Sequence, residues 1–359
     1  MTEPFPAEGL SLERARQRVL EAVLPLEGRE SVPLAEALGR VCAVPVRAKE
    51  DVPGFRGSIM DGYAVAAADA PVEGTRWPLV GRSAPGAPFA RELGVGEAVR
   101  ILTGAPVPEG ARRVLPQELM EVEERASGPS SPQRAPGEGS SPPDRAIVLR
   151  GVAGTNAWIR AADEEATAGE ELIGAGIRLG PAELGRLAAC GVAELEVVRR
   201  PRLGLLISGD ELVPPGTARR SGQIWESNGT LLEALLGRLG YPVTERRVVG
   251  DDPQALRQAF THLAAGHDVV VSTGGVSAGD TDWIRPLLAE LGTVAFWKLF
   301  LKPGRPFAFG DLNGKPFFGL PGNPVAAAIT ALQLLWPALQ RLEGAEARLL
   351  PRLRVRLSA

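Results

Sequence analysis

The sequence has very little histidine and cysteine, and each shortage argues against a class of site. Its 359 residues include two histidines, His262 and His267, so a His-based catalytic triad or a zinc site is not expected. The two cysteines, Cys42 and Cys190, stand far apart and form no metal or redox motif. That usage fits a protein of the reducing cytoplasm.

Long apolar runs and a strong net charge are also missing. The N-terminus, MTEPFPAEG, is acidic and lacks the apolar core of a signal peptide. No apolar run approaches the roughly 20 residues that span a bilayer. The net charge is −3, which is not the basic footprint of a nucleic-acid-binding protein. We therefore expect a cytoplasmic protein with no membrane and no nucleic-acid partner.

Lysine is scarce as well, and its few positions are informative. Among 40 basic residues there are four lysines, and two of them, Lys298 and Lys302, stand close together in WKLFLKPGRP. Because they are four positions apart, they would share one face of either a strand or a helix, where they could hold an anion. Lys298 taken alone is more simply a solvated edge residue.

The first half of the chain predicts a helix and an irregular β-rich domain. Residues 10–26 have helical spacing, with Ser11 as N-cap, and we expect this helix to pack on a later domain. Residues 48–168 are rich in Gly and Pro with short apolar runs, which indicates irregular β structure. Inside it, the low-complexity stretch 127–144 is expected to be a disordered surface loop. Residues 27–47 and 169–199 would form a linking, extended domain.

From residue 200 to 342, buried strands alternate with helices of about 12 residues. This order predicts a doubly wound, mostly parallel α/β sheet with helices on both faces. Asn313-Gly314 is a hairpin turn signal. Asp252 and Asn323, each followed by proline, are expected to be helix N-caps.

Three strands of this α/β domain run into unusual loops, at the edge where open α/β sheets bind ligands. Their glycines would let backbone N–H groups approach an anion, and the helix after GNP would add its positive end. The spacing matches neither a P-loop nor G-x-G-x-x-G. The candidate cofactor-binding residues on these loops are Ser208, Gly209, Gly274, Gly275, Gly322 and Asn323. The resemblance described below adds Ser277, Arg305, Pro321 and Pro324 to this set.

The same loops carry four carboxylates, Asp210, Glu211, Asp280 and Asp282. They would repel a phosphate unless a cation bridged them, and Mg²⁺ is the usual bridge. These four residues are therefore the candidate metal ligands, and the sequence leaves open which of them bind. Asp251 or Asp252 alone is more simply a helix cap.

The β-rich region adds two motifs, RGSIMDGYAV (56–65) and RILTGAPVPEG (100–110). Taken singly, the first reads as a turn and the second as a loop closed by prolines. Together with GDEL, DDP, STGGVSAGDTD, WKLFLKPGRPFAFG and GLPGNPV, they form an ordered set. That set resembles the molybdopterin molybdenumtransferases, which are related to the E domain of gephyrin, from about residue 10 to 345.

The resemblance implies a reaction and an assembly. Such an enzyme takes adenylylated molybdopterin and molybdate as substrates and, with Mg²⁺, places molybdenum on the dithiolene and releases AMP. It would be an elongated cytoplasmic homodimer whose active site is shared between the α/β domain of one subunit and the β-rich domain of the other. A molybdopterin adenylyltransferase is a possible partner.

The resemblance also implies residue roles, carried over position by position. The matching catalytic positions are Asp61, Thr103, Glu211, Asp251, Asp282, Lys298 and Lys302. Ser277, Pro321 and Pro324 match as well. The chain departs from the family at Glu165, Glu226, Arg305 and Ala326, and only the last loses a polar group. Residues 343–359 would begin the family's small C-terminal β domain, which is then largely missing.

Two other functions stay open at this point. The chain could be a scaffold that binds molybdopterin without turning it over, because relatives of gephyrin also bind receptor peptides. It could instead be a molybdopterin adenylyltransferase, which the α/β domain alone also resembles. Those enzymes lack the motifs SIMDGYAV and RILTGAPVP, and this chain has both.

Overall fold

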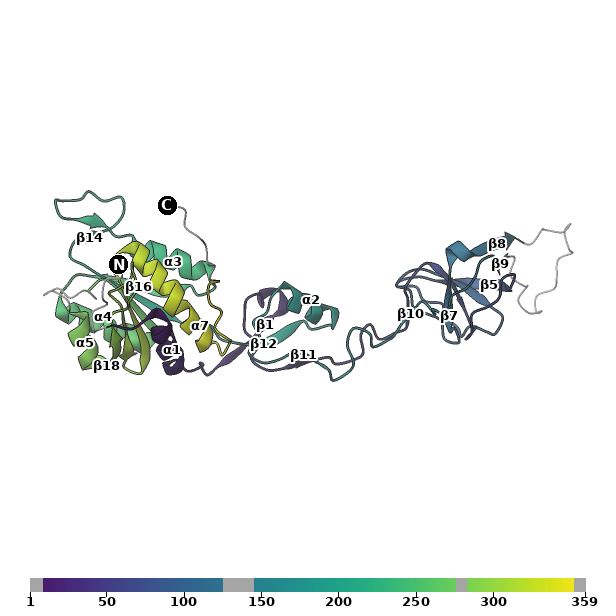
Figure 1. Cartoon of the computed structure of the whole chain (residues 1–359), viewed down its shortest axis with the longest axis horizontal. Coiled ribbons are helices and arrows are strands. Elements are labelled where there is room, and N and C mark those ends of the chain that lie inside the picture. Colours follow the sequence, from purple (N-terminus) through teal and green to yellow (C-terminus); the bar gives the residue numbers. More distant parts are fainter. Residues whose placement is uncertain (1–8, 125–144, 276–282, 352–359) are drawn as a thin grey trace, which may run out of the picture. The chain divides into compact units, whose positions relative to one another are not determined.

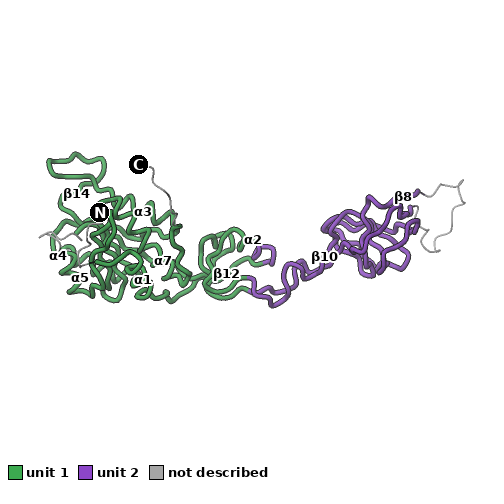
Figure 2. Tube along the Cα trace, viewed as in Figure 1, with its two compact units in different colours: residues 1–46, 173–185, 192–359 green, residues 47–172, 186–191 purple. Residues whose placement is uncertain are grey.

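The computed structural model describes residues 9–124, 145–275 and 283–351. The chain divides into two compact units (Figure 2). The first, here called the α/β unit, comprises Met1–Val46, Ile173–Gly185 and Val192–Ala359. The second, the β unit, comprises Arg47–Leu172 and Arg186–Gly191. The expected surface loop 127–144 lies outside the described residues.

A six-stranded sheet forms the centre of the α/β unit, in the order β16-β13-β17-β20-β19-β18. The first four strands of that order are parallel, and β19 is antiparallel to both of its neighbours. Asn313 and Gly314 make the predicted hairpin turn between β19 and β20, both with positive φ. The strands are β13 (Leu203–Ser208), β16 (Val243–Val249), β17 (Val269–Thr273), β18 (Gly292–Trp297), β19 (Ala308–Leu312) and β20 (Lys315–Leu320).

Helices cover both faces of this sheet, so the doubly wound α/β prediction is confirmed (Figure 1). Leu205 and Ile207 of β13 face one hydrophobic cluster, and Leu206 faces the other, as alternation along a strand requires. The first cluster includes α1 (Leu12–Ala22), α3 (Asn228–Arg238), α6 (Pro324–Thr330), a π-helical stretch (Ala331–Leu335) and α7 (Trp336–Leu342). The second includes α4 (Pro253–Gly266) and α5 (Ile284–Leu291).

The predicted helix starts are confirmed by their caps. The side chains of Ser11, Asp252 and Asn323 each accept a hydrogen bond from a backbone N–H three residues on. β18 ends at Trp297, because Lys298 directly after it adopts a left-handed φ of 75°. Left-handed backbone does not continue a strand.

One helical stretch corrects an expectation from the sequence. Pro324–Leu342 is long and apolar enough to cross a membrane by length and composition, with a mean hydropathy of 1.2. No apolar run of that length was expected from the sequence. In the structure, 61% of the stretch is buried, and Ala327, Leu334 and Leu339 lie in the first cluster. It is thus a core helix of the α/β unit.

The β unit has a six-stranded sheet of its own, in the order β7-β4-β6-β5-β9-β8. Two hydrophobic clusters pack against it, one with Tyr63 and Trp77 and the other with Val99 and Val114. The predicted β-rich character is confirmed. The strands of this sheet are β4 (Gly62–Val65), β5 (Arg76–Ser83), β6 (Ala98–Ile101), β7 (Arg113–Pro116), β8 (Met120–Glu124) and β9 (Arg145–Leu149). A separate pair is formed by β3 (Gly57–Ser58) and β10 (Ile159–Arg160), and Gln117–Leu119 is a short 3-10 helix.

The remaining elements are short. In the α/β unit, β1 (Arg29–Pro33) pairs antiparallel with β12 (Glu194–Val198), and Leu34–Glu36 forms a single 3-10 turn. Residues 343–351 form neither helix nor strand, and 352–359 lie outside the described part of the chain. The others are β2 (Val46–Arg47), β11 (Glu171–Ile173), α2 (Pro181–Ala189), β14 (Leu212–Val213) and β15 (Ile224–Trp225).

A buried carboxylate ties the segment 173–185 to the rest of the α/β unit. Glu343 is 1% exposed, and its Oε2 accepts hydrogen bonds from Arg178 Nη2 and from the Tyr241 hydroxyl, both at 2.7 Å. Burial and the Glu343 charge raise the pKa of the Tyr241 phenol, so it stays a donor. The three side chains come from three separate stretches of chain.

Replacing Glu343 by alanine should therefore destabilise the α/β unit. The change leaves the Arg178 charge and the Tyr241 hydroxyl without their acceptor, which costs about 3–5 kcal/mol for a buried ion pair. Chemical denaturation followed by circular dichroism measures the loss. The matched control is Glu346→Ala, because Glu346 is exposed three residues away. Equal effects of the two substitutions would contradict this account of the network.

Candidate active site

The carboxyl ends of four parallel strands meet at one edge of the α/β sheet. The register pairs Ser208 with Val249, Ile207 with Thr273, and Thr273 with Leu320. Neighbouring strands lie about 4.8 Å apart, so the loops that leave them start side by side. Sequence reasoning counted three of these loops. The structure adds the one after β16, which begins at Gly250.

A glycine turn after β17 approaches the end of β13 very closely. Gly274 and Gly275 have φ values of 88° and 58°. A Cβ on Gly274 would lie 2.4 Å from the Ser208 carbonyl oxygen, so no larger residue fits without a shift. The Ser208 hydroxyl is buried beside this turn and has no hydrogen-bond partner within the described residues. Within the described part of the chain, an unpaired hydroxyl therefore lies beside a glycine turn that packs closely on the end of β13.

Asn228, the first residue of α3, links two of the loops and is not among the site residues expected from the sequence. Its Nδ2 donates to Thr273 Oγ1 at 2.7 Å and to the Gly322 carbonyl oxygen at 2.9 Å. It is 8% exposed, and its Oδ1 has no partner in the part of the chain that the structure describes. The cue was Ser-Asn-Gly before an apolar helix, which places a polar side chain at a helix start on this edge.

The helix after β20 begins at the same edge. Asn323 Oδ1 accepts from the Ala326 backbone N–H at 3.1 Å, and Pro324 occupies the first helical turn. The free N–H groups of such a helix start carry partial positive charge. Gly322, just before it, lies against the Gly274 turn, because a Cβ there would be 3.8 Å from Gly274 Cα. Two loops therefore direct backbone donors to one region.

Carboxylates gather on the β13 and β16 side of this edge. Asp210 Oδ1 accepts from the Asp251 backbone N–H at 2.9 Å. Burial raises the pKa of Asp251, and the nearby charges of Asp210 and Glu211 raise it further. The helix-cap interpretation holds for Asp252, whose Oδ2 accepts from the Ala255 N–H. Asp251 is therefore left beside two other acids.

The four proposed metal ligands are only partly visible. Asp280 and Asp282 lie outside the described residues, as does Ser277. Among the residues that are described, no group of three or more His, Cys, Asp or Glu could hold a metal ion. Asp210 and Glu211 still supply hard oxygen donors of the kind that Mg²⁺ prefers. The chemistry of these two fits the cation, and the complete ligand set stays a prediction.

The lysine segment reaches the same edge by a different route. β18 is antiparallel to β19, which is antiparallel to β20, so β18 and β20 run in the same direction. Lys298, directly after β18, therefore lies at the carboxyl edge, two strands from β20. Residues 298–307 are irregular, and Leu299 N–H closes a loop onto the Arg305 carbonyl oxygen at 2.9 Å. The periodicity argument that paired Lys298 with Lys302 is thus wrong, because neither strand nor helix continues there.

In the β unit, the structure brings together the two expected site residues. Asp61 Oδ1 accepts from the Thr103 backbone N–H at 2.7 Å and from its hydroxyl at 2.8 Å. These bonds lower the pKa of Asp61, so the carboxylate is charged at neutral pH. Thr103 itself is exposed. These bonds join the turn at Asp61 to the loop at Thr103, which is 42 residues further along the chain.

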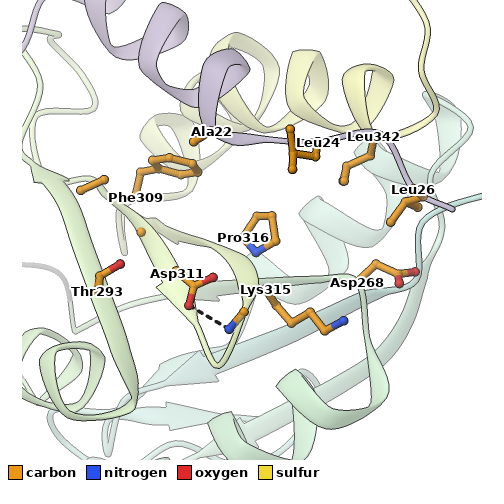
Figure 3. Close-up of a pocket in the computed structure, with 13 residues that line it drawn as sticks. Ala22, Leu24, Leu26, Asp268, Thr293, Phe309, Asp311, Lys315, Pro316 and Leu342 are labelled. Carbon is orange, nitrogen blue, oxygen red and sulfur yellow. Dashed lines mark hydrogen bonds between the residues drawn. The ribbon is translucent and has the colours of Figure 1, made fainter.

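A cavity of about 300 Å³ in the α/β unit lies away from this site (Figure 3). It is lined by Asp268, Thr293, Asp311 and Lys315, which stand at the other ends of β17 to β20. Leu24 and Leu342 line its apolar side, and Asp311 Oδ1 accepts from the Gly314 N–H at 2.8 Å. The carboxyl edge, with its unused donors, is therefore the candidate site.

Comparison with known proteins decides the family. Residues 10–191 match the MoeA N-terminal region (domain I and II), and residues 204–341 match a probable molybdopterin binding domain. A molybdopterin molybdenumtransferase of Haemophilus influenzae is 36% identical over 335 residues, which is 93% of this chain and 78% of that protein. The chain belongs to the molybdopterin molybdenumtransferase family. It is thereby an enzyme of molybdenum cofactor biosynthesis.

Other members of the family agree with this assignment. Molybdopterin molybdenumtransferase 2 of Mycobacterium tuberculosis is 32% identical and covers 91% of this chain and 78% of its own length. The crystal structure of a molybdopterin biosynthesis moeA protein from Pyrococcus horikoshii has a TM-score of 0.75 at 31% identity, with 94% of this chain and 81% of that chain covered. The predicted fold and family are both confirmed.

The structure also places the departures from the family pattern. Glu226 is buried, and its Oε1 accepts from the Gly229 N–H at 2.7 Å, so it supports the start of α3 beside Asn228. Ala326 is 3% exposed, and its N–H is taken by Asn323. Glu165 receives a hydrogen bond from Arg160 in the β unit. Glu226 therefore stabilises the start of α3 at this edge of the sheet.

Asn228→Asp should disturb the site more than its size suggests. The new carboxylate has no N–H to donate, so it faces the Gly322 carbonyl oxygen with like charge. Losing a buried hydrogen-bond donor costs about 1–3 kcal/mol of unfolding free energy. The control is Asn323→Asp, which keeps the acceptor of a helix cap and should be nearly neutral in stability. Thermal unfolding compares the two, and equal stability would show that Asn228 does not tie the loops together.

Proposed function

We propose that this chain inserts molybdenum from molybdate into adenylylated molybdopterin and releases AMP. The observation that carries the proposal is the single edge at which four parallel strand ends present a glycine turn, a helix start and carboxylates. Relatives in the same family carry the name molybdopterin molybdenumtransferase. Scaffold binding without turnover is the competing outcome that the experiment below separates.

The pyrophosphate would lie against the Gly274–Gly275 turn and the start of α6. Both offer backbone N–H groups, and Ser208 adds a hydroxyl with no partner in the described structure. Preorganised donors of this kind stabilise charge that builds up when a phosphate bond is cleaved. Pro321 and Pro324 flank Gly322 and Asn323 at the start of α6, where the proline rings restrict the backbone. Catalysis would therefore depend mainly on how these donors position the pyrophosphate, and it needs no histidine as a base.

Mg²⁺ would be held by Asp210 and Glu211, with Asp280 and Asp282 as the further predicted ligands. When bound, it would neutralise charge on the pyrophosphate oxygens. Asp251 lies beside these two carboxylates, because its backbone N–H donates to Asp210 Oδ1. A divalent cation would neutralise part of the negative charge gathered there. Among the described residues, the chain's own contribution is the carboxylate oxygens of Asp210 and Glu211.

Molybdate, a tetrahedral dianion, would be attracted by Lys298, Lys302 and Arg305. Lys298 stands at the carboxyl edge after β18, and the other two side chains are exposed in the loop that follows. Arg305 keeps the charge of the lysine that is frequent at this position in the family. These cations would raise the local concentration of an anion.

The same proposal includes a cytoplasmic homodimer with a shared active site. Asp61 and Thr103 are held ready by their mutual hydrogen bonds in the β unit, and they would complete the site of the other subunit. A molybdopterin adenylyltransferase would be the partner that supplies the substrate. The location, the homodimer, the shared site and the partner are all proposed from the family resemblance.

AMP release from adenylylated molybdopterin tests the proposal. Wild-type protein should release AMP with molybdate and Mg²⁺ and should lose this activity when Mg²⁺ is chelated. Asp210→Asn should lower the rate about 10²–10³-fold, the usual loss for one preorganised electrostatic group. Asp252→Asn, which keeps the helix cap on the neighbouring loop, should retain the wild-type rate.

Two results would contradict the proposal. Binding of the adenylylated substrate without any AMP release, with molybdate and Mg²⁺ present, would support the scaffold function. Formation of adenylylated molybdopterin from ATP would support the adenylyltransferase function. Equal rates for Asp210→Asn and Asp252→Asn would leave the reaction standing and remove Asp210 from the site.

A further inference from the structure

A small excursion of the chain, residues 212–225, leaves the candidate site and returns to it. Its two strands, β14 (Leu212–Val213) and β15 (Ile224–Trp225), pair with each other in parallel, and the excursion stands out from the α/β unit in Figure 1. The Ile224 N–H donates to the Glu211 carbonyl oxygen at 2.9 Å, and the Glu226 N–H donates to that of Val213 at 2.8 Å. The base of the excursion is thus attached to the carboxylate loop.

Trp225 at this base is exposed but fixed. Its indole Nε1 donates to the Thr217 carbonyl oxygen at 2.9 Å. The Arg219 guanidinium lies over the ring, 4.1 Å from its centroid. Nearly half of the residue, 47%, remains exposed. Since Arg219 covers one face and Thr217 holds the ring edge, an ordered aromatic surface stays open to solvent.

This surface lies within reach of the candidate site. Trp225 is in register with Val213, which is two residues beyond Glu211. Two residues of extended chain span about 7 Å at most, and paired strands are about 4.8 Å apart. A sugar between a phosphate and its base can bridge such a separation. The position is therefore suited to the ring of a ligand whose phosphates occupy the edge.

We propose that Trp225, backed by Arg219, stacks on a flat heteroaromatic ring of the substrate. This rests on the proposed function, in which the substrate carries two such rings, adenine and pterin. Aromatic side chains bind bases through their faces without reading their edges. Arg219 lies 4.1 Å from the ring centroid and would hold the indole from one side through a cation–π contact. Trp225 is thus a binding residue, and Arg219 positions it.

Isothermal titration of the full chain in the presence of Mg²⁺ tests the stacking directly. The probes are AMP, which has adenine and phosphate, ribose 5-phosphate, which lacks a ring, and 6-hydroxymethylpterin, which has only the pterin ring. Wild type should bind AMP or the pterin more tightly than ribose 5-phosphate. Trp225→Ala should weaken the ring-bearing probe about 5- to 100-fold, the range for loss of one base stack.

Two further variants separate stacking from disruption of the excursion. Trp225→Phe keeps a flat ring but loses the bond to Thr217, so its affinity should fall between wild type and Trp225→Ala. Ile224→Ala removes an exposed apolar side chain from the same strand and should leave every affinity unchanged. A loss confined to AMP identifies adenine as the stacked ring, and a loss confined to the pterin identifies the pterin.

Three results would overturn the inference. The first is that Trp225→Ala binds AMP and the pterin as tightly as wild type does. The second is that the same substitution weakens ribose 5-phosphate as much as AMP. The third is that wild type binds neither ring-bearing probe more tightly than ribose 5-phosphate. Release of AMP from adenylylated molybdopterin by wild type is read separately. If wild type releases AMP and one of these three results is found, only the stacking role of Trp225 is contradicted. If wild type releases no AMP, the proposed function is contradicted.

Discussion

The parallel register of β16, β13, β17 and β20 is the constraint on which the site depends. It brings four loops to one edge, although their residues are far apart in the sequence. The close approach of the Gly274 turn to the Ser208 carbonyl oxygen then fixes two of those loops against each other. Asn228 joins the third through its bonds to Thr273 and Gly322. Shape at this edge is therefore set by backbone packing.

Charge at the same edge has two opposite signs, and the chemistry follows from that. Backbone donors of the glycine turn and of α6 attract an anion, while Asp210, Glu211 and Asp251 repel one. A divalent cation reconciles the two, because it binds carboxylate and phosphate oxygens together. The excursion that begins after Glu211 adds an aromatic surface to this arrangement. Phosphate, cation and ring would then all be held at or beside one edge of the sheet.

Local patterns in the sequence predicted much of the fold. Runs of valine and leucine marked the buried strands, Asn313-Gly314 marked the hairpin, and Ser11, Asp252 and Asn323 marked helix starts. Each of these signals acts within a few residues, so no tertiary information was needed. The ordered motifs predicted the family for the same reason, because they could be compared one stretch at a time.

The parts that local patterns could not predict are those set by tertiary contacts. Lys298 ends β18 with a left-handed backbone, and no neighbouring residue announces it. Asn228 looks like an ordinary helix start until its partners, Thr273 and Gly322, are seen beside it. The helix Pro324–Leu342 has the composition of a membrane span, and only its burial identifies it as core. The partners of Asn228 and the surroundings of Pro324–Leu342 are distant in sequence. The end of β18 depends on one backbone angle at Lys298.

The central claim is that the carboxyl edge of the sheet holds the anionic substrate. Anomalous scattering at the molybdenum edge, from crystals grown with molybdate, Mg²⁺ and AMP, measures this most directly. The account predicts a molybdenum peak at that edge, on the side of the Lys298 loop, with AMP density at the Gly274–Gly275 turn. Molybdenum and AMP at the opposite edge, in the cavity beside Lys315 and Asp311, would contradict it.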